Sequence, residues 1–462
     1  MRQRFVRSPC GAGTVLGLAL TLLGSDAAAQ SPLQPTNVVP NFDRIRVGQV
    51  EGLEGGAYVA RTGNAGANWY NPAGLAMAEK TVINASANAY EYTTVSLEGL
   101  DQRFPSGRFS SLGTYFAGVI GSEVMGRSRL RLGFSFTRPV LWSPGAVSGV
   151  LGGVTPGSGG ESLDFHFNSE MTVAIPALAA GYPLTDRLRV GVGVGLPITW
   201  LKAENRVGNR LVSPLQGEQA FQSASLDGQS YQLQATAGVQ WEVSEALRLG
   251  ATFTSPGLHL GGSSLASAQT FESDASGALD ISFRDDGATF KYPLPMRIVG
   301  GFSASLGDFE VEANLRYHGS RDVFDMVHTE ARATVVRTDA DGTPTVVQED
   351  VAPARETLSA VTNLALGGNY ALAGSWRLHA GVFTDRSPVG NPDTSQFQTV
   401  DLTGFGLAVS FGGQLSGTIG VSSNWGTTLD RRFGPSLGGV EGTTEVNIRT
   451  FSLHYALSYT FQ

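Results

Sequence analysis

The sequence predicts an all-β protein, a transmembrane antiparallel β-barrel of about 14 strands with an N-terminal plug in its lumen. Three observations support this fold class. Apolar and polar residues alternate along many segments, and the connections between these segments are alternately short and long. A segment without alternation precedes the first of them.

The composition fits a barrel better than a helical membrane protein. The chain has 462 residues, 60 of them glycine, and a formal net charge of −8. Its mean hydropathy is −0.02. Membrane helices would make the chain far more apolar, because each span needs about 20 apolar residues in a row. A barrel strand needs only every second residue to be apolar. The acidic balance also argues against a nucleic-acid partner, which requires a basic surface.

Residues 1–29 have the pattern of a secretory signal peptide. The charged start consists of Arg2, Arg4 and Arg7. A short apolar run, Thr14–Leu23, follows, and Ala27–Ala29 supplies a small-residue cleavage site, so the mature chain is expected to begin at Gln30. Cys10 is the only cysteine and would leave with the signal. Disulfides and thiol catalysis are therefore excluded for the mature chain.

The last segment shows the alternation best. Its apolar residues are Phe451, Leu453, Tyr455, Leu457, Tyr459 and Phe461. Between them lie Ser452, His454, Ala456, Ser458 and Thr460. The apolar face carries aromatic residues at both ends, as expected where strands meet the two membrane interfaces. The same period recurs in residues 130–136, 188–200, 231–243 and 309–318.

The connections predict the number of strands. Short turns are expected near residues 121–127, 184–188, 244–247, 307–308, 373–376 and 412–417. Long loops are expected at residues 98–108, 142–166, 207–228, 259–291, 321–356, 387–400 and 429–447. This arrangement places both chain ends on the short-turn side and predicts a barrel over residues 80–462.

Residues 30–79 lack the alternation of a spanning strand. A barrel of this size has a lumen too wide for its own side chains to fill. The segment could therefore fold inside the barrel as a plug, or remain outside it as a periplasmic tail. Composition leaves both alternatives open.

One stretch of this segment resembles a known family. It comprises Gly55–Ala60 and then Asn64–Ala76, which contains Asn71-Pro72-Ala73 directly after an aromatic pair. The stretch resembles the N-terminal hatch of the long-chain fatty acid outer-membrane transporters, the FadL or toluene-transporter type. Two further segments, 292–297 and 378–389, resemble that family's proline-flanked strand start and its late strand ending in Ser-Pro. Asn64 departs from the family, which often has an acidic residue there.

The resemblance implies passive uptake of hydrophobic molecules, long-chain fatty acids or similar apolar compounds. In that family a ligand binds in the lumen and leaves sideways beside a kinked strand, while the hatch gates the path. It therefore assigns a gating role to Asn71, Pro72 and Ala73. It also implies a monomer in the bacterial outer membrane whose partners are the ligand, the lipid bilayer, lipopolysaccharide and the barrel-assembly machinery.

Several single residues are candidates for the route. Gly133 could kink the third strand, or could simply be small and inward-facing. Arg189, Lys202 and Arg316 are predicted to face the lumen, where a cation beside an apolar pocket could bind a carboxylate. They could equally pair with lumen acids such as Glu310.

The sequence predicts no enzyme, metal site or cofactor. The six histidines lack metal-ligand spacing. Gly434–Gly438 matches a nucleophile-elbow pattern, but it lies in an expected loop without the strand and helix that the motif needs. Asp339–Gly342 is better explained as a hairpin turn than as a calcium loop. Two other functions stay open: a general porin for hydrophilic solutes, and a barrel adhesin or enzyme acting through its outer loops.

Overall fold

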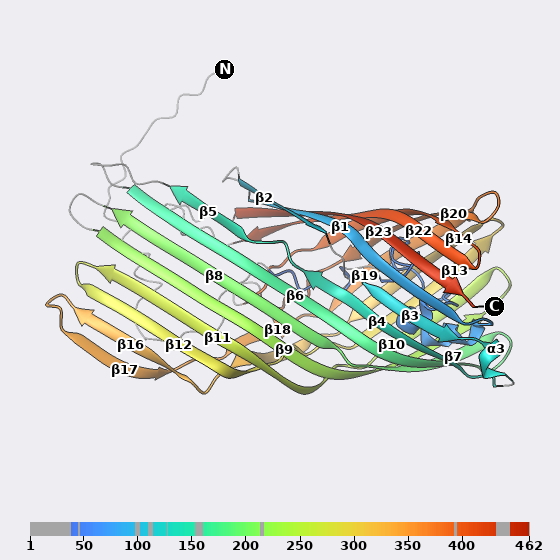
Figure 1. Ribbon diagram of the computed structural model, residues 1–462, viewed down its shortest axis with the longest axis horizontal. Coiled ribbons are helices and arrows are strands. Elements are labelled where there is room, and N and C mark those ends of the chain that lie inside the picture. Colours follow the sequence, from blue (N-terminus) through green and yellow to red (C-terminus); the bar gives the residue numbers. More distant parts are fainter. Residues whose placement is uncertain are drawn as a thin grey trace, which may run out of the picture.

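The computed structural model describes residues 38–44, 47–97, 102–109, 114–126, 128–152, 160–212, 217–391, 395–430 and 444–461. In this part of the chain the strands form a barrel that closes on itself (Figure 1). The first strand, β1 (Val82–Leu97), closes the barrel by pairing antiparallel with the last, β23 (Thr444–Thr460).

The strands occupy fourteen wall positions, which confirms the predicted number. Several positions hold two or three consecutive strands, because the wall strands are interrupted. Position 1 is β1, and position 2 holds β2 (Gln102–Phe109) and β3 (Tyr115–Ile120). Position 3 holds β4 (Arg131–Trp142) and β5 (Val147–Gly152), and position 4 is β6 (Gly160–Pro183). Position 5 holds β7 (Leu188–Gly195) and β8 (Ile198–Val212). Position 6 is β9 (Gly217–Glu242), position 7 holds β10 (Leu247–Thr254) and β11 (Leu258–Asp274), and position 8 holds β12 (Gly277–Phe290) and β13 (Arg297–Leu306).

The remaining positions complete the circuit. Position 9 holds β14 (Phe309–His318), β15 (Arg321–His328) and β16 (Arg332–Asp339), and position 10 holds β17 (Pro344–Asp350), β18 (Ala354–Leu358) and β19 (Val361–Ala371). Positions 11 to 14 are β20 (Trp376–Asp385), β21 (Leu402–Phe411), β22 (Leu415–Asp430) and β23. The three helices in the described residues are short: α2 (Ala67–Tyr70), η1 (Pro72–Met77) and α3 (Ser122–Met125). None of the helices in this part of the chain has the length and apolar character needed to cross a bilayer.

Many strands are longer than predicted. β6 has 24 residues and β9 has 26, whereas a tilted strand crosses a bilayer with about 9–11. Three predicted loops, 207–228, 259–291 and 321–356, are therefore largely wrong. The first two consist mainly of the paired ends of β8, β9, β11 and β12, and the third consists mainly of β15 to β18. The predicted loops 98–108 and 142–166 also contain most of β2 and all of β5. Polar strand ends beyond the lipid keep their hydrogen-bonded ladder, but they no longer need an apolar face.

The outer surface of the wall is apolar, as the alternation predicts. Exposed residues include Leu132, Phe134 and Phe136 on β4, and Leu364 and Leu366 on β19. Aromatic side chains are exposed near the short turns, among them Trp241, Phe309, Trp376 and Tyr459. Such a surface is stable against lipid rather than water. The barrel is therefore of the membrane-spanning type.

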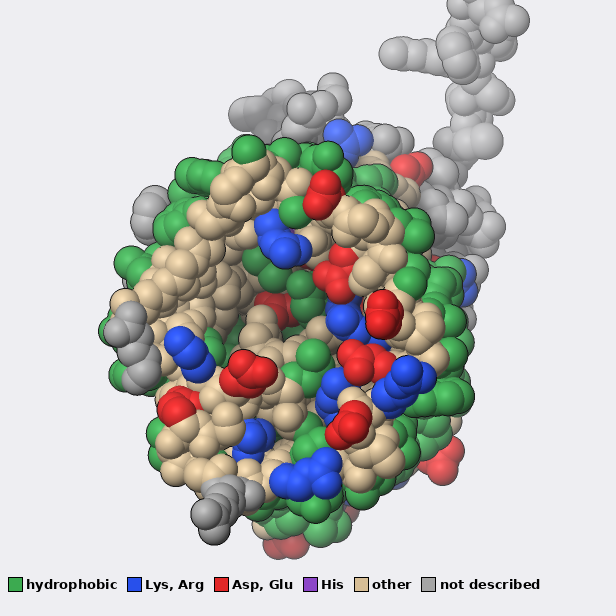
Figure 2. Space-filling model, turned by 90° about the vertical axis from the view of Figure 1, so that its right-hand side faces the viewer, with side chains coloured by type: hydrophobic (Ala, Val, Ile, Leu, Met, Phe, Trp, Pro, Cys, Tyr) green, Lys and Arg blue, Asp and Glu red, His purple; other side chains and the backbone are tan. Residues whose placement is uncertain are grey.

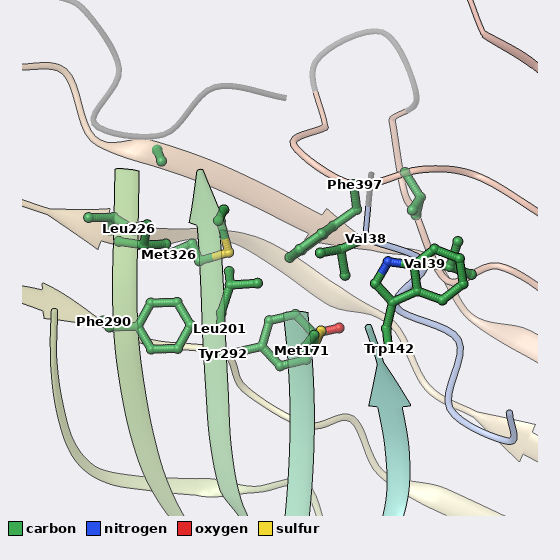
Figure 3. Close-up of a cluster of buried hydrophobic side chains, with 14 of the residues drawn as sticks. Val38, Val39, Trp142, Met171, Leu201, Leu226, Phe290, Tyr292, Met326 and Phe397 are labelled. Carbon is green, nitrogen blue, oxygen red and sulfur yellow. The ribbon is translucent and has the colours of Figure 1, made fainter. Parts of the chain in front are cut away.

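The interior is filled differently at its two ends. At the end opposite the short turns, apolar side chains from many strands and from the connection after β20 meet in one cluster (Figure 3). Trp142, Met171, Tyr292 and Phe397 belong to this cluster. Val38 and Val39, where the described chain begins, are buried in the same cluster.

The segment Val38–Ala78, called the hatch below, lies inside the barrel in its described part. Most of its residues are buried. Its hydrogen bonds reach wall strands far apart in sequence, from Gly118 on β3 to Asp385 on β20. The alternative of a tail outside the barrel does not fit these contacts.

A charge on the outward face should be costly at mid-strand. Leu366 lies midway along β19 and is 49% exposed. Leu366→Arg is expected to destabilise the folded barrel by about 2–4 kcal/mol, because the cation would enter lipid. Denaturant titration in lipid vesicles measures this change. Val346→Arg, on the exposed strand β17, is the control and should cost little. Equal costs at the two sites would contradict the assignment of Leu366 to the lipid face.

Candidate functional site

A ring of glycines brings the wall into contact with the hatch. A Cβ atom added to any of these glycines would lie within 2.8 Å of a hatch atom. At Gly191 it would lie 2.2 Å from the carbonyl carbon of Pro72, and at Gly250 it would lie 2.3 Å from the carbonyl oxygen of Val59. We call this set the glycine collar: Gly133, Gly181, Gly191, Gly238, Gly250, Gly301, Gly367, Gly381, Gly406 and Gly420.

The collar glycines come from ten different wall positions. Only a residue without a side chain allows so close an approach. The hatch is therefore seated directly on the wall over most of the circumference. No side chain of ordinary size fits between the two at these points.

The Asn71-Pro72-Ala73 motif lies at this contact. The Asn71 Nδ2 donates to the carbonyl oxygens of Val59, at 2.8 Å, and Val239, at 2.9 Å. Its Oδ1 accepts from the Ala73 N–H at 3.1 Å and so caps η1. Asn71 thus joins two parts of the hatch to β9. These contacts make the motif an anchor of the hatch.

Gly133 does not kink its strand. It belongs to the collar, opposite Asn68, and β4 stays in register with β6 at that point. The register shift lies further along, between Thr137 and Val140. Pro139 sits within this shift and lacks the N–H that a regular ladder requires. Of the two alternatives for Gly133, the small, inward-facing residue fits the structure and the kink does not, although the strand is the irregular one.

Beyond this bulge the wall is not fully paired. All residues from Thr137 to Trp142 are buried, so both faces of this part of β4 are covered. In the described residues β2 pairs only with β1, and β5 pairs only with β6. No ladder joins wall positions 2 and 3 there. We call this the wall gap.

A cavity of about 100 Å³ lies inside the barrel beside the bulge. Much of its surface is apolar. Ala177, Gly193 and Gly195 are small and leave room for it. Its larger apolar lining residues are Phe42, Trp69, Pro72, Pro139, Val140, Val173, Ile175, Leu178, Val194, Leu294 and Pro295.

One end of the cavity is charged. Asp43 lies 3.0 Å from the His318 Nε2 and 3.7 Å from the Arg316 guanidinium, and it accepts from the Asn363 amide at 3.1 Å. Burial alone would raise the pKa of Asp43, but His318 and Arg316 together hold it well below its usual value. Asp43 is therefore ionised.

Arg297 lines the same end of the cavity. Its guanidinium lies 5.1 Å from the centre of the Trp69 ring. Its Nε has no hydrogen-bond partner, and it forms no ion pair within 4.0 Å among the described residues. Arg297 and Arg316 thus face a single carboxylate, that of Asp43. The cavity carries an excess of positive charge at this end.

Of the predicted ligand contacts, Arg189 and Lys202 do not line the cavity, and Arg316 lies beside Asp43 at its charged end. Arg189 faces the lumen near a short turn and pairs with Glu242 at 3.1 Å. Arg316 faces the lumen and donates to the Gly55 carbonyl oxygen at 2.8 Å. The prediction that Lys202 faces the lumen is wrong. Its side chain is 62% exposed and pairs with Asp227 at 3.3 Å, while the neighbouring Leu201 is buried inside.

Lys202 could have been placed correctly from the sequence. The alternation that sends Trp200 outward also sends Lys202 outward, two residues on. The sequence analysis missed Asp43, Arg297 and His318. Arg297 ends the proline-flanked segment 292–297, which was noted only for its resemblance.

The short-turn end of the lumen is charged. Arg61 of the hatch pairs with Glu54, and it lies 3.3 Å from both Glu310 and Glu312. His379 bonds Glu54 at 2.6 Å. Figure 2 shows this end hollowed, with basic and acidic side chains gathered around the hollow. An apolar molecule leaving by this end would have to pass these charges.

The other motifs carry no site. In the described part of the chain, no three His, Cys, Asp or Glu side chains are grouped so as to hold a metal. Asp339–Gly342 joins β16 to β17, with Gly342 at φ +83°, so the predicted hairpin turn is confirmed. Gly434–Gly438 lies outside the described residues.

Comparison with known proteins supports the fold. No family model and no curated protein matches the chain. Among solved structures, it is similar to the CymD monoaromatic hydrocarbon channel, at TM-score 0.52 and 15% identity over 91% of this chain and 99% of that one. A Pseudomonas aeruginosa FadL homologue matches at 0.54 and 13% identity, over 93% and 100%. The Ralstonia pickettii toluene transporter TbuX matches at 0.54 and 14%, over 91% and 100%.

These matches cover nearly the whole of each channel. The chain therefore has the fold of the FadL-type channels, which confirms the predicted resemblance at the level of the fold. At identities of 15% or less, the fold is what the comparison establishes.

The collar predicts an unusual sensitivity to one methyl group. Gly191→Ala should destabilise the protein by about 1–3 kcal/mol, because the added Cβ collides with the Pro72 backbone. Gly300→Ala is the matched control, since nothing lies within 4 Å of a Cβ there. Thermal unfolding of the purified barrel and protease cleavage of the hatch would measure both. Equal stability of the two variants would contradict close docking.

Proposed function

We propose that this protein is an outer-membrane channel for the passive uptake of hydrophobic molecules, such as long-chain fatty acids or similar compounds. The ligand binds in the lumen cavity and leaves sideways through the wall, and the hatch blocks the direct path. The observation that carries the proposal is the position of the cavity. It lies between a hatch seated on the wall and the wall gap.

The proposal includes the maturation of the chain. Residues 1–29 direct secretion and are removed, residues 30–79 form the hatch, and residues 80–462 form the barrel. The barrel-assembly machinery inserts it as a monomer among lipid and lipopolysaccharide, with the short turns in the periplasm. Residues 1–37, which contain the signal and the cleavage site, lie outside the described residues.

The sideways exit is favoured by the polarity of the two possible routes. The direct route to the periplasm runs past the collar contacts and the charges around Arg61. The wall gap instead lies beside Pro139 and Val140, which line the cavity. An apolar solute that leaves there enters lipid without crossing water, which avoids the cost of hydrating its surface.

Arg297 indicates the kind of ligand that binds best. An anionic head group would balance the excess positive charge that Arg297 brings to the cavity. Charged hydrogen bonds of this kind contribute about 1.5–3 kcal/mol. The apolar lining would hold the adjoining part of the ligand. The favoured ligand is therefore an acid with an apolar chain, with Arg297 at its carboxylate.

A change at Arg297 should separate acids from neutral molecules. Arg297→Met is expected to weaken dodecanoate binding about 10- to 150-fold, the equivalent of about 1.5–3 kcal/mol. Dodecanol has the same chain but no charge, so its affinity should change little. Titration calorimetry in detergent would measure both ligands.

Arg189→Met serves as the control, because Arg189 pairs with Glu242 away from the cavity. Equal loss of both ligands in Arg297→Met would contradict the head-group role. Failure of the unaltered protein to bind either ligand, together with large, steady ion currents in planar bilayers, would instead favour a general porin.

The bulge in β4 gives a test of the exit. β4 has one residue more than β6 between the pairs Thr137–Ile175 and Val140–Val173. Deleting Pro139 should restore the register and straighten the strand, since such bulges bend the strand that carries them. Uptake of radiolabelled oleate by cells should then fall to the background level, while dodecanoate binding in detergent is retained. Unchanged uptake would rule out an exit at this bulge.

A further inference from the structure

The hatch is seated less closely on one side of the barrel. The described residues of β23, β1 and β3 contribute none of the collar glycines. Polar side chains face the lumen here on wall positions 14 and 1, and also on position 13, where Thr418 and Ser422 flank the collar residue Gly420. We call this set the polar seam: Thr418, Ser422, Asn424, Thr450, Ser452, His454, Ser458, Asn84, Ser86, Asn88, Glu91 and Thr93.

The hatch covers the polar seam mainly through long side chains. Arg44 pairs with Glu91 at 3.3 Å. Gln49 donates to the Ser416 hydroxyl at 3.2 Å and accepts from the Asn84 amide at 2.9 Å. This contact contrasts with the backbone packing along the collar.

Several polar atoms of the seam are buried without a protein partner. They are the Oδ1 atoms of Asn84, Asn88 and Asn424 and the hydroxyls of Ser86 and Thr418. Buried polar atoms in proteins almost always have a hydrogen-bond partner, and water takes that place where the protein does not. Five such atoms, on β22 and β1 to either side of β23, indicate a hydrated interface.

Two small cavities lie along the same part of the hatch. One, of about 10 Å³, is lined by Gly48, Gln49, Ser86, Thr114 and His454, among others. This volume is about that of one water-sized probe. It adjoins the bulge in β1 between Asn88 and Tyr90, where the closing ladder of the barrel is interrupted.

The other cavity, also about 10 Å³, is lined in part by Val47, the residue before Gly48. It shares Asp43, Trp69 and Arg297 with the ligand cavity. The two small cavities share no lining residue, but Val47 and Gly48 are consecutive in the hatch. Small cavities therefore occur along the hatch between the ligand cavity and Gln49, which contacts Ser416 at the short-turn end.

The charge beside this path changes along it, because Arg297 and Arg316 line the cavity next to the ligand site, whereas the cavity at Gly48 adjoins the carboxyl group of Glu51. Glu51 is fully buried, and its Oε2 accepts from the N–H groups of Gln49 and Val50, at 2.7 and 3.0 Å. Its Oε1 has no partner, and no cation pairs with it among the described residues. The Glu51 carboxyl group lies beside Gly48, which lines the small cavity next to Ser86 and His454. An unpaired carboxylate favours cations over anions.

We propose that the polar seam is a second, hydrated route past the hatch, which passes water and small cations. It is separate from the sideways route of the apolar ligand and does not depend on the identity of that ligand. The protein would then show a small, cation-selective ion conductance, distinct from the large current of an open porin.

Cysteine labelling during conductance measurement tests this route. Cys10 is the only cysteine of the chain, so Ser86→Cys and Asn88→Cys would be made in a Cys10→Ser background. The purified protein is placed in a planar bilayer in KCl and treated with a cationic methanethiosulfonate reagent. Both variants should react, and their current should fall.

Ala179→Cys is the matched control. Ala179 is also small and faces inward, but it packs with Leu75 on the collar side. It should not react, and its current should not change. Glu51→Gln should move the reversal potential in a KCl gradient towards zero.

The absence of any current above that of bare lipid would overturn the proposal. So would a current that the reagent leaves unchanged in both Ser86→Cys and Asn88→Cys. Dodecanoate binding in the same preparation reports separately on the ligand site. Loss of the seam conductance with retained dodecanoate binding would therefore leave the uptake function standing.

Discussion

The structure depends on close contact between the hatch and the glycines of the barrel wall. Ten wall positions have glycine, and therefore no side chain, at this level. In exchange, a segment with little regular secondary structure of its own gains a rigid support. The buried amide of Asn71 then satisfies carbonyl groups on both the hatch and β9. This contact explains why the Asn71-Pro72-Ala73 motif lies where it does in the hatch and why it contains these residues.

The same contact divides the interior by polarity. Apolar space collects above the collar, next to the irregular strand β4, and ends at Arg297. Charged groups collect below it, around Arg61. On the side that lacks the collar, the hatch meets hydroxyl and amide groups instead. Neighbouring regions of one lumen therefore offer very different solvation to an apolar chain and to an ion.

The structural features that the lipid environment requires were the ones best predicted from the sequence. Alternation is required wherever a strand crosses the bilayer, so the number of strands and the outward position of residues such as Phe134 and Leu453 could be predicted. Strand ends beyond the lipid obey no such rule, and β9 was accordingly predicted too short. The hatch motif was recognised by resemblance, because a segment held by backbone contacts leaves no periodic pattern.

The candidate site was only partly predictable, for a related reason. Arg297 and His318 face each other across the β13–β14 hairpin, so the predicted short turn at 307–308 could have paired them. Asp43 lies in a hatch turn, and only the folded hatch brings it to them. Gly133 illustrates the limit of reading a glycine alone. Gly133 is needed because Asn68 of the hatch packs directly against it. The irregularity of the strand comes instead from Pro139.

The pairing of β1 with β23 has a consequence for biogenesis. Residues 82 and 460 are partners, so the cylinder cannot shut until almost the entire polypeptide has been delivered. The hatch precedes β1 and touches strands from both halves of the chain. Because no side chain fits between hatch and wall along the collar, a hatch that entered a finished cylinder would collide with the wall there. A wall that closes around the hatch avoids this collision, and the N-terminal segment would then serve as a template for assembly.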